Sequence, residues 1–290
     1  MTGPSHEIVE RVVRLLGWVP STWRPVHGGY TPTARYAVAD GKRRGFVKIA
    51  TTELTARMVN REIANYAGIS GRFVPRVLAT DPDPNVPILI IEDLSHATWP
   101  PPWTDSLLHE VLDTIAEMHA TPSTIAHGDL LHGREAGWPT VAQNPAPFLS
   151  LGLVATSWLE GALPALVAAE RSCQLTGDAL THLDLRSDNL CRTAEGIKLV
   201  DWAEGCRSNA AVDLGFFLPS LAYEKGPTPE SLLPDRPDVA ALVSGFFAAR
   251  AGLPDIPNAP FVRRVQREQL STALPWAVRA LGLKPPRAGL

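Results

Sequence analysis

The sequence predicts an α+β protein of two lobes, a small lobe with an antiparallel sheet and one major helix, followed by a larger, mostly helical lobe. Residues 23–49 have strand and turn composition, including a hairpin signal between two apolar runs. The apolar run 88–91 predicts a buried strand. After Leu94 the composition changes and apolar residues recur at helical spacing. We therefore place the smaller lobe at residues 1–93 and the larger at residues 94–290.

The smaller lobe is expected to begin with an amphipathic helix over residues 5–17, which Ser5 is suited to cap and Gly17 to end. A second helix is predicted over residues 52–68. The predicted strands share apolar or β-branched runs bounded by turn residues, and they occupy residues 23–26, 34–38, 45–49 and 88–91.

The larger lobe is predicted to be helical apart from one hairpin. Residues 105–119 place apolar side chains on one helical face, and the alanine-rich residues 151–174 are also expected to be helical. Residues 122–150 have irregular composition. After a hairpin over residues 189–201, further helices are expected to begin at Val212 and to span residues 236–251 and 259–282.

Composition and charge exclude several classes of function. The net charge of −3 and the pI of about 6.2, without any block of basic residues, argue against a nucleic-acid partner. No apolar run is long enough to span a membrane, and the first residues lack the features of a signal peptide. Three cysteines without metal-binding spacing favour reduced thiols, so we expect a cytoplasmic protein. Whether it is a monomer or a homodimer is left open.

The most informative motif is H-x-D-x-x-x-x-N at residues 182–189, followed by a short apolar run that ends at Asp201. Phosphoryl transfer needs a carboxylate that accepts the proton of the attacking hydroxyl, and oxygen ligands that hold Mg²⁺ against the phosphates. Asp184 stands where the base is needed, and Asn189 and Asp201 stand where the metal ligands belong. The residues between the two ligands have hairpin composition, which predicts that they lie side by side.

A second segment, His127-Gly128-Asp129, begins like the same motif, but Arg134 stands where the asparagine is needed. No apolar strand leads from this segment to a carboxylate. We therefore reject it as the catalytic loop and keep Asp129 as a candidate for the substrate site. The alternative for residues 182–189 is a polar surface loop with incidental carboxylates.

Together these residues resemble the aminoglycoside phosphotransferase/choline kinase family, the small-molecule branch of the protein-kinase-like fold, over roughly residues 20–285. The resemblance is specific in residues 182–217 and weaker in the smaller lobe. It implies a bilobal protein-kinase-like fold, ATP and Mg²⁺ as cofactors, and a small-molecule acceptor. The full glycine pattern of protein kinases is absent, and Trp202 replaces the phenylalanine that follows their metal-binding aspartate.

The resemblance also assigns phosphate-binding roles in the smaller lobe. Lys48, on an apolar strand, would reach the α- and β-phosphates. Glu62, in the middle of a helix, is preferred as the carboxylate that orients the lysine, because Glu53 in the first turn is explained by the helix dipole. Gly28 and Gly29 would cover the phosphates with backbone N–H groups.

Other residues are assigned to the hinge and to the catalytic loop. The segment Glu92-Asp93-Leu94 resembles the hinge between lobes, where a strand that stops would offer unpaired backbone groups to adenine. Asp213 is expected to support the catalytic loop, and His182 to hold its geometry. For Arg186, an ion pair with Asp188 and a contact near the γ-phosphate are equally open.

The hypothesis is Mg²⁺- and ATP-dependent phosphorylation of a hydroxyl on an antibiotic or related natural product. A choline, homoserine or sugar kinase is the alternative, and a nucleotide-binding pseudokinase is the rival from another class. The short stretch between Asp201 and Asp213 disfavours a protein kinase, because it leaves no activation segment. A cationic acceptor could be bound by a modest set of acidic residues, Asp129, Glu160, Glu204 and Glu224. An apolar acceptor could be bound by tryptophans, for which the candidates are Trp138, Trp158, Trp202 and Trp276. The apolar character of residues 122–176 favours a less charged acceptor.

Overall fold

The computed structural model describes residues 3–128, 137–257 and 259–286, and the chain forms two compact units. Both units are discontinuous in the sequence. The first comprises the described residues of Met1–Pro100, Ser106–Ile125 and Asp188–Gly205, and the second those of Pro101–Asp105, Ala126–Ser187 and Cys206–Leu290.

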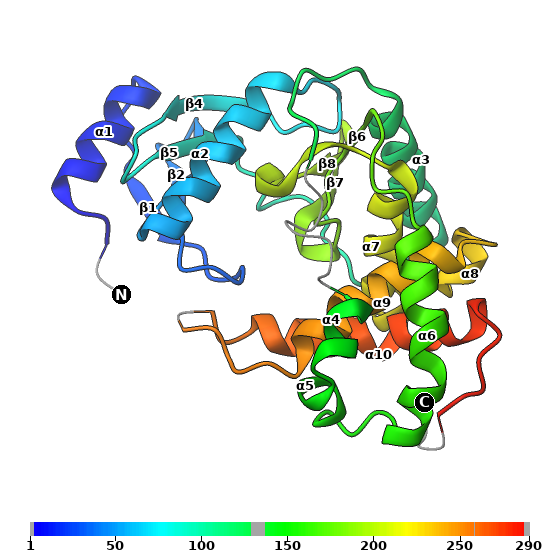
Figure 1. The fold of residues 1–290 in the computed structure, drawn as a ribbon. Coiled ribbons are helices and arrows are strands. Elements are labelled where there is room, and N and C mark those ends of the chain that lie inside the picture. The colour runs from blue at the N-terminus through cyan, green and yellow to red at the C-terminus, as the bar shows by residue number, and fades with distance from the viewer. Residues whose placement is uncertain (1–2, 129–136, 258, 287–290) are drawn as a thin grey trace. The chain divides into compact units, whose positions relative to one another are not determined.

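A five-stranded antiparallel sheet in the order β1-β2-β3-β5-β4 forms the centre of the first unit (Figure 1). Its strands are β1 (Thr22–Pro25), β2 (Ala34–Ala39), β3 (Arg44–Ile49), β4 (Val77–Asp81) and β5 (Ile88–Ile91). Pairing of β4 with β5 starts at Val77, and Pro75, two residues earlier, has no N–H to donate to a ladder.

Helices α1 (His6–Leu16) and α2 (Glu53–Gly68) meet opposite faces of this sheet. Val12 of α1 packs in one buried cluster with Tyr36, Val47 and Ile90. Because successive side chains of a strand point to opposite faces, Lys48 leaves the other face, where it contacts α2. The alternating side chains of β3 therefore give the sheet one apolar face and one face that carries charge.

The first unit also contains a short hairpin, β7 (Leu190–Thr193) and β8 (Gly196–Leu199), flanked by the 3₁₀ turns η1 (Ser187–Asn189) and η2 (Trp202–Glu204). Gly196 has a φ of 113°, which favours glycine at the tight turn. Helix α3 (Asp105–Ala120) is joined to the hairpin by an ion pair of Glu110 with Arg192 at 3.1 Å.

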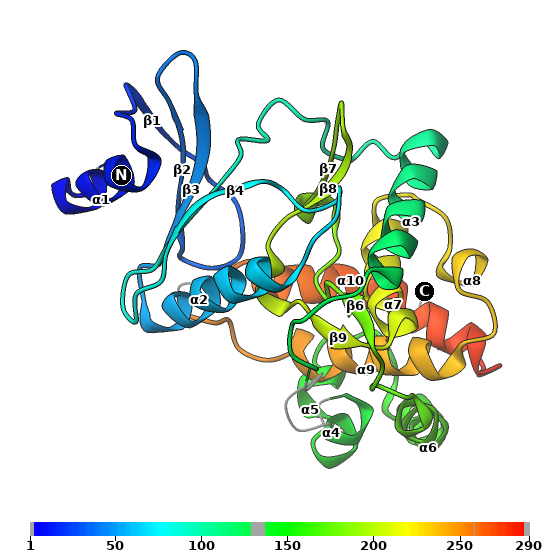
Figure 2. The same cartoon turned by 90° about the horizontal axis from the view of Figure 1, so that it is seen from above.

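The second unit is mostly helical and is centred on α9 (Pro237–Ala251), whose side chains are buried almost all round. Its helices are α4 (Trp138–Gln143), α5 (Ala146–Leu149), α6 (Thr156–Ser172), α7 (Ala210–Tyr223), α8 (Pro229–Leu232), α9 (Pro237–Ala251) and α10 (Val262–Ala280). A small sheet of β6 (Ala179–Thr181) and β9 (Cys206–Ser208) is seen near α7 in Figure 2.

The α+β class, with an antiparallel sheet in the N-terminal region and helices in the C-terminal region, is confirmed. The prediction that residues 122–150 are irregular was wrong for α4 and α5, which are short helices with proline in or next to their first turn. None of the helices among the described residues is long and apolar enough to cross a bilayer.

Candidate functional site

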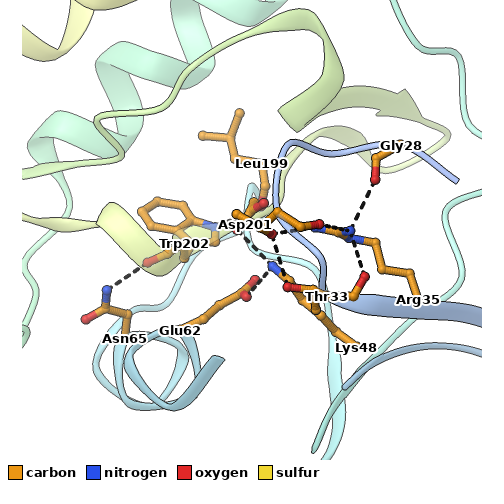
Figure 3. Close-up of polar contacts among 10 residues, drawn as sticks. Gly28, Thr33, Arg35, Lys48, Glu62, Asn65, Leu199, Asp201 and Trp202 are labelled. Atoms are coloured by element: carbon orange, nitrogen blue, oxygen red, sulfur yellow. Dashed lines mark hydrogen bonds and ion pairs between the residues drawn. The ribbon is translucent and has the colours of Figure 1, made fainter. Parts of the chain in front are cut away.

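Lys48 lies between two carboxylates of the first unit (Figure 3). Its Nζ donates to Oε2 of Glu62 at 2.5 Å and to Oδ1 of Asp201 at 2.8 Å. These residues come from β3, α2 and the end of the hairpin, and Lys48 and Asp201 are 153 positions apart in the sequence. Glu53, the alternative partner, pairs instead with Arg57 at the exposed start of α2. The fold therefore brings together three residues singled out in the sequence.

The charged forms of Lys48 and Glu62 are not equally stabilised. Burial favours the neutral form of Lys48, but Asp201 and Glu62 outweigh it and raise the lysine pKa above its ordinary value. Burial raises the pKa of Glu62 to about 6, because Lys48 offsets desolvation only in part and Asp201 adds repulsion. The two shifts agree physically, since two carboxylates attract one lysine while they repel each other. Lys48 is thus held as a cation.

The position of Asp201 is fixed by the turn that follows it. Asp201 has φ 66° and ψ 59°, a left-handed conformation that is costly for a non-glycine residue. Asn65 of α2 holds the turn, with Nδ2 donating to the carbonyls of Trp202 at 2.7 Å and Gly205 at 2.9 Å. The indole N–H of Trp202 closes the turn on Leu199 O at 2.8 Å. The strain at Asp201 is therefore supported by buried contacts on both sides.

Asn189 lies across the hairpin from Val200, the residue before Asp201, since Val200 N donates to Asn189 O at 2.9 Å. Amide and carboxylate oxygens are the hard donors that Mg²⁺ prefers, so these two residue types fit the metal that the resemblance implies. Among the described residues, no three His, Cys, Asp or Glu side chains gather as a metal site. Mg²⁺ held by this pair would take its remaining ligands from phosphate and water, as is usual at nucleotide sites.

The Gly28-Gly29 segment is bound by a residue that the sequence analysis missed. Both glycines have positive φ, 127° and 77°, which requires glycine at this turn. The guanidinium of Arg35 donates to the carbonyl oxygens of Gly28 at 3.1 Å and Thr33 at 3.0 Å (Figure 3). The register of β2 and β3 places Arg35 opposite Lys48, but no residue pattern in the sequence marks its backbone carbonyl partners.

In the hinge segment Glu92-Asp93-Leu94, one backbone group that was expected to be unpaired has a hydrogen-bond partner. The N–H of Glu92 is paired, because it donates to Arg76 O at 2.9 Å, and the Glu92 carboxylate accepts the N–H of Arg76 at 2.8 Å. The strand pairing thus continues one residue past β5. Leu94 O also accepts hydrogen bonds, from Ala97 N at 3.0 Å and from the Trp99 indole at 3.2 Å.

The loop that contains Asp184 lies in the second unit and is held by a buried carboxylate. Asp213 accepts the N–H of Leu183 at 2.6 Å and of His182 at 3.2 Å, and Leu183 has a left-handed φ of 60°. His182 is fully buried, and its Nδ1 lies 3.3 Å from the N–H of Asp184. The carboxylate of Asp184 pairs with Arg186 at 2.9 Å. Both supporting residues therefore act on the backbone of this loop.

The side chains proposed to surround the acceptor are mostly engaged elsewhere. Glu224 accepts from the Trp103 indole at 2.7 Å and from Ser187 Oγ at 2.5 Å, and Glu204 pairs with Arg61 at 3.5 Å. Asp129, with the rest of 129–136, lies outside the described residues. Three tryptophans are core residues, which corrects the proposal that they offer aromatic surface: Trp138, Trp202 and Trp276.

The family model APH, described as a phosphotransferase enzyme family, matches residues 22–256. No curated protein matches the sequence. The structure is similar to a thermostable mutant of aminoglycoside phosphotransferase APH(4)-Ia in ternary complex with ADP and hygromycin B. That similarity has a TM-score of 0.60 at 12% identity, over 98% of this chain and 100% of that one.

Two further structures show the same fold. Spectinomycin phosphotransferase APH(9)-Ia, in complex with ADP and spectinomycin, has a TM-score of 0.57 at 12% identity, over 96% of this chain and 95% of that one. Choline kinase from Cryptosporidium parvum has a TM-score of 0.55 at 13% identity, with the same coverage of 96% and 95%. At these identities the likeness establishes the fold, and the fold expected from the sequence is confirmed.

Proposed function

The chain belongs to the APH phosphotransferase enzyme family and is a small-molecule kinase, and we propose that it uses ATP with Mg²⁺ to phosphorylate a hydroxyl of an antibiotic or related natural product. One observation carries this proposal, the contact of Lys48 with both Glu62 and Asp201. A lysine held as a cation between two carboxylates is poised to bind phosphate oxygens.

We assign nucleotide binding to residues 1–93 and catalysis with acceptor binding to residues 94–290. Lys48 binds the phosphates, Glu62 orients Lys48, and Gly28 and Gly29 cover the phosphates with backbone N–H groups. For adenine, the N–H of Glu92 is already paired, so we assign the contacts to the carbonyl of Glu92 and the N–H of Leu94.

Asn189 and Asp201 are the residues that would hold Mg²⁺, which neutralises phosphate charge when bound. Asp184 orients the acceptor hydroxyl, and its carboxylate takes the hydroxyl proton as the phosphoryl group is transferred. Arg186, at 2.9 Å from Asp184, keeps that carboxylate in place. The buried Asp213 holds the loop through two backbone N–H groups.

An acceptor of low positive charge fits the second unit best. Glu224, the acidic residue nearest in sequence to the end of α7, already accepts two hydrogen bonds. Glu160 is exposed on α6 and is the remaining described acidic candidate in this unit. Binding a polycation needs several carboxylates that are not already occupied. With Glu224 occupied and Glu160 as the other described candidate, these acidic residues favour a natural product with few amines over a polycationic aminoglycoside.

The test is a coupled assay of ADP release with purified protein, ATP and Mg²⁺ across aminoglycosides, macrolides, nucleoside antibiotics, choline, homoserine and sugars. We expect turnover with one antibiotic class, and loss of that turnover in Asp201→Ala. Turnover with choline, homoserine or a sugar alone would establish the metabolic alternative. The absence of ADP release with every acceptor, and of slow hydrolysis without one, would favour a pseudokinase.

A further inference from the structure

Arg35 is a second cation on the charged face of the sheet. The register of β2 and β3 places Arg35 directly opposite Lys48. Residues paired across an antiparallel ladder point to the same face, so both side chains leave the sheet on the side of α2. Lys48 is paired with two carboxylates there. Arg35 forms no ion pair with any described residue.

The guanidinium of Arg35 instead binds the turn that contains the two glycines. Its Nη1 donates to the carbonyl oxygens of Gly28 at 3.1 Å, Thr33 at 3.0 Å and Thr31 at 3.5 Å. Its Nη2 donates to Thr31 Oγ1 at 3.4 Å, and that hydroxyl lies 3.1 Å from Thr33 Oγ1. One planar group thus closes residues 28–33 on themselves, which a lysine ammonium cannot do in the same way.

Gly29 makes room for this arrangement. A Cβ at Gly29 would lie 2.7 Å from Nη2 and 2.9 Å from Cζ of Arg35. The residue therefore has to be small for the guanidinium to lie against the turn, in addition to having a φ of 77°.

The direction of these hydrogen bonds orients the turn. In a trans peptide the C=O and the next N–H point in opposite directions. Binding the carbonyl of Gly28 to Arg35 consequently directs the N–H of Gly29 away from the guanidinium. A turn held in this way presents a defined set of donors before any ligand arrives, and that preorganisation lowers the cost of binding an anion.

We propose that Arg35 is a positioning residue for the nucleotide phosphates, which it serves by holding the turn of residues 28–33 in its receptive conformation beside Lys48. This inference rests on the function proposed above. It differs from a general contribution to folding because its effect depends on how many phosphates the nucleotide carries.

The test is calorimetric titration of the full-length protein and its Arg35→Met variant with ATP, ADP, AMP and adenosine. We expect Arg35→Met to weaken ATP binding by about ten-fold or more, since charged hydrogen bonds are lost, and to leave adenosine binding within about two-fold. In kinetics, the KM for ATP should rise while kcat at saturating ATP changes little. Arg44→Met, which removes an exposed charge from the next strand, is the matched control and should behave as wild type.

Two further variants separate positioning from charge and from misfolding. Arg35→Lys keeps the charge but lacks the planar fork, and should weaken ATP binding nearly as much as Arg35→Met. Gly29→Ala displaces the flexible end of Arg35 without removing it, and should give the same phosphate-dependent loss. Its control is Gly41→Ala, at φ 91° in open space at a hairpin tip.

ATP binding by Arg35→Met within two-fold of wild type would overturn the inference. Equal losses for ATP and adenosine, or full rescue by Arg35→Lys, would overturn it as well. Wild-type protein that binds none of the nucleotides would instead overturn the proposed function, and with it this dependent role.

Discussion

Asp184 and Asp201 are both aspartates next to a cation, but their surroundings suit them to different tasks. Asp201 is held in a left-handed conformation and shares Lys48 with Glu62. Asp184 follows a left-handed Leu183 and is paired with Arg186 at 2.9 Å. The two side chains are exposed to a similar extent, 34% for Asp184 and 32% for Asp201, so both are accessible to a ligand. The roles we propose for them, proton transfer for Asp184 and metal binding for Asp201, therefore rest on what each contacts.

Replacing Asp184 with asparagine tests the first of these roles. The amide cannot take a proton, so Asp184→Asn should lower kcat by about 10²- to 10⁴-fold. Because the nucleotide contacts we assign come from other residues, the affinity for ATP should stay near that of wild type. Steady-state kinetics and calorimetry measure the two quantities. Asp188→Asn, the same change at an exposed position of the loop, is the control, and a wild-type kcat in Asp184→Asn would rule out the assignment.

Helix α2 links the lysine strand to the turn after Asp201. Glu62 reaches Lys48 from this helix, and Asn65, one turn later, binds the carbonyls of Trp202 and Gly205. Thr52 caps the start of the helix, where its side chain and that of Thr55 exchange hydrogen bonds with each other's backbone N–H groups. A single helix thus fixes the distance between residues that are far apart in the sequence.

Asn65→Leu should reveal this link. The substitution leaves two buried carbonyls without their donor, which costs about 1–3 kcal/mol of unfolding free energy per unsatisfied group. It should also raise the KM for ATP, because the turn that positions Asp201 loses its anchor. Urea unfolding and ATP kinetics measure the two effects.

Asn60→Leu is the matched control for that change. Asn60 lies on the same helix and donates to Asp83 O at 2.7 Å, away from the hairpin. The Asn60→Leu variant should have a lower free energy of unfolding than wild type, but the wild-type KM for ATP. If Asn65→Leu also keeps the wild-type KM, the anchoring role of α2 is wrong.

The elements predictable from the sequence are those with local signals. The strand of Lys48, the helix of Glu62 and the hairpin before Asp201 each have a periodic or turn pattern, and each is present. The three-residue strands β6 and β9 were not anticipated, because they pair residues 179–181 with residues 206–208 and have no local pattern. Arg35 was missed for a related reason, since its partners are backbone carbonyls that leave no mark on composition.

At the scale of the whole molecule, the two units each require distant parts of the chain. Residues 188–205 belong to the first unit, although they directly follow the loop of Asp184 in the second. One of the sequence boundaries between the two units falls between Ser187 and Asp188, within the H-x-D-x-x-x-x-N motif.

A buried carboxylate in the second unit makes the stability of the molecule depend on pH. Glu170 of α6 accepts the N–H of Trp138 at 2.6 Å, while its Oε1 is buried without a hydrogen-bond partner among the described residues. Gly137 and Gly245 give it space, since a Cβ on either would lie 2.3 Å from a carboxylate oxygen. Burial raises the pKa of Glu170 to about 7, against weaker opposing effects of Trp138, Arg250 and Arg171.

The sign of the effect follows from proton uptake. The unfolded chain has a carboxyl pKa near 4.5, so between that value and about 7 the folded state binds more protons than the unfolded state. The contribution of Glu170 to stability is therefore fully present below about pH 4.5 and is lost as the pH rises through about 7. With 1.36 kcal/mol per pKa unit, the loss is at most about 3 kcal/mol.

Glu170→Gln should remove this dependence, because the amide keeps the shape and an acceptor for Trp138 but does not ionise. Urea unfolding at about pH 5 and about pH 8 should show wild type losing up to about 3 kcal/mol more than Glu170→Gln over that interval. Glu160→Gln, an exposed glutamate on the same helix, should follow wild type. Parallel stability curves for wild type and Glu170→Gln would mean that the carboxyl titrates as it does in the unfolded chain, and that solvent reaches it in the folded state.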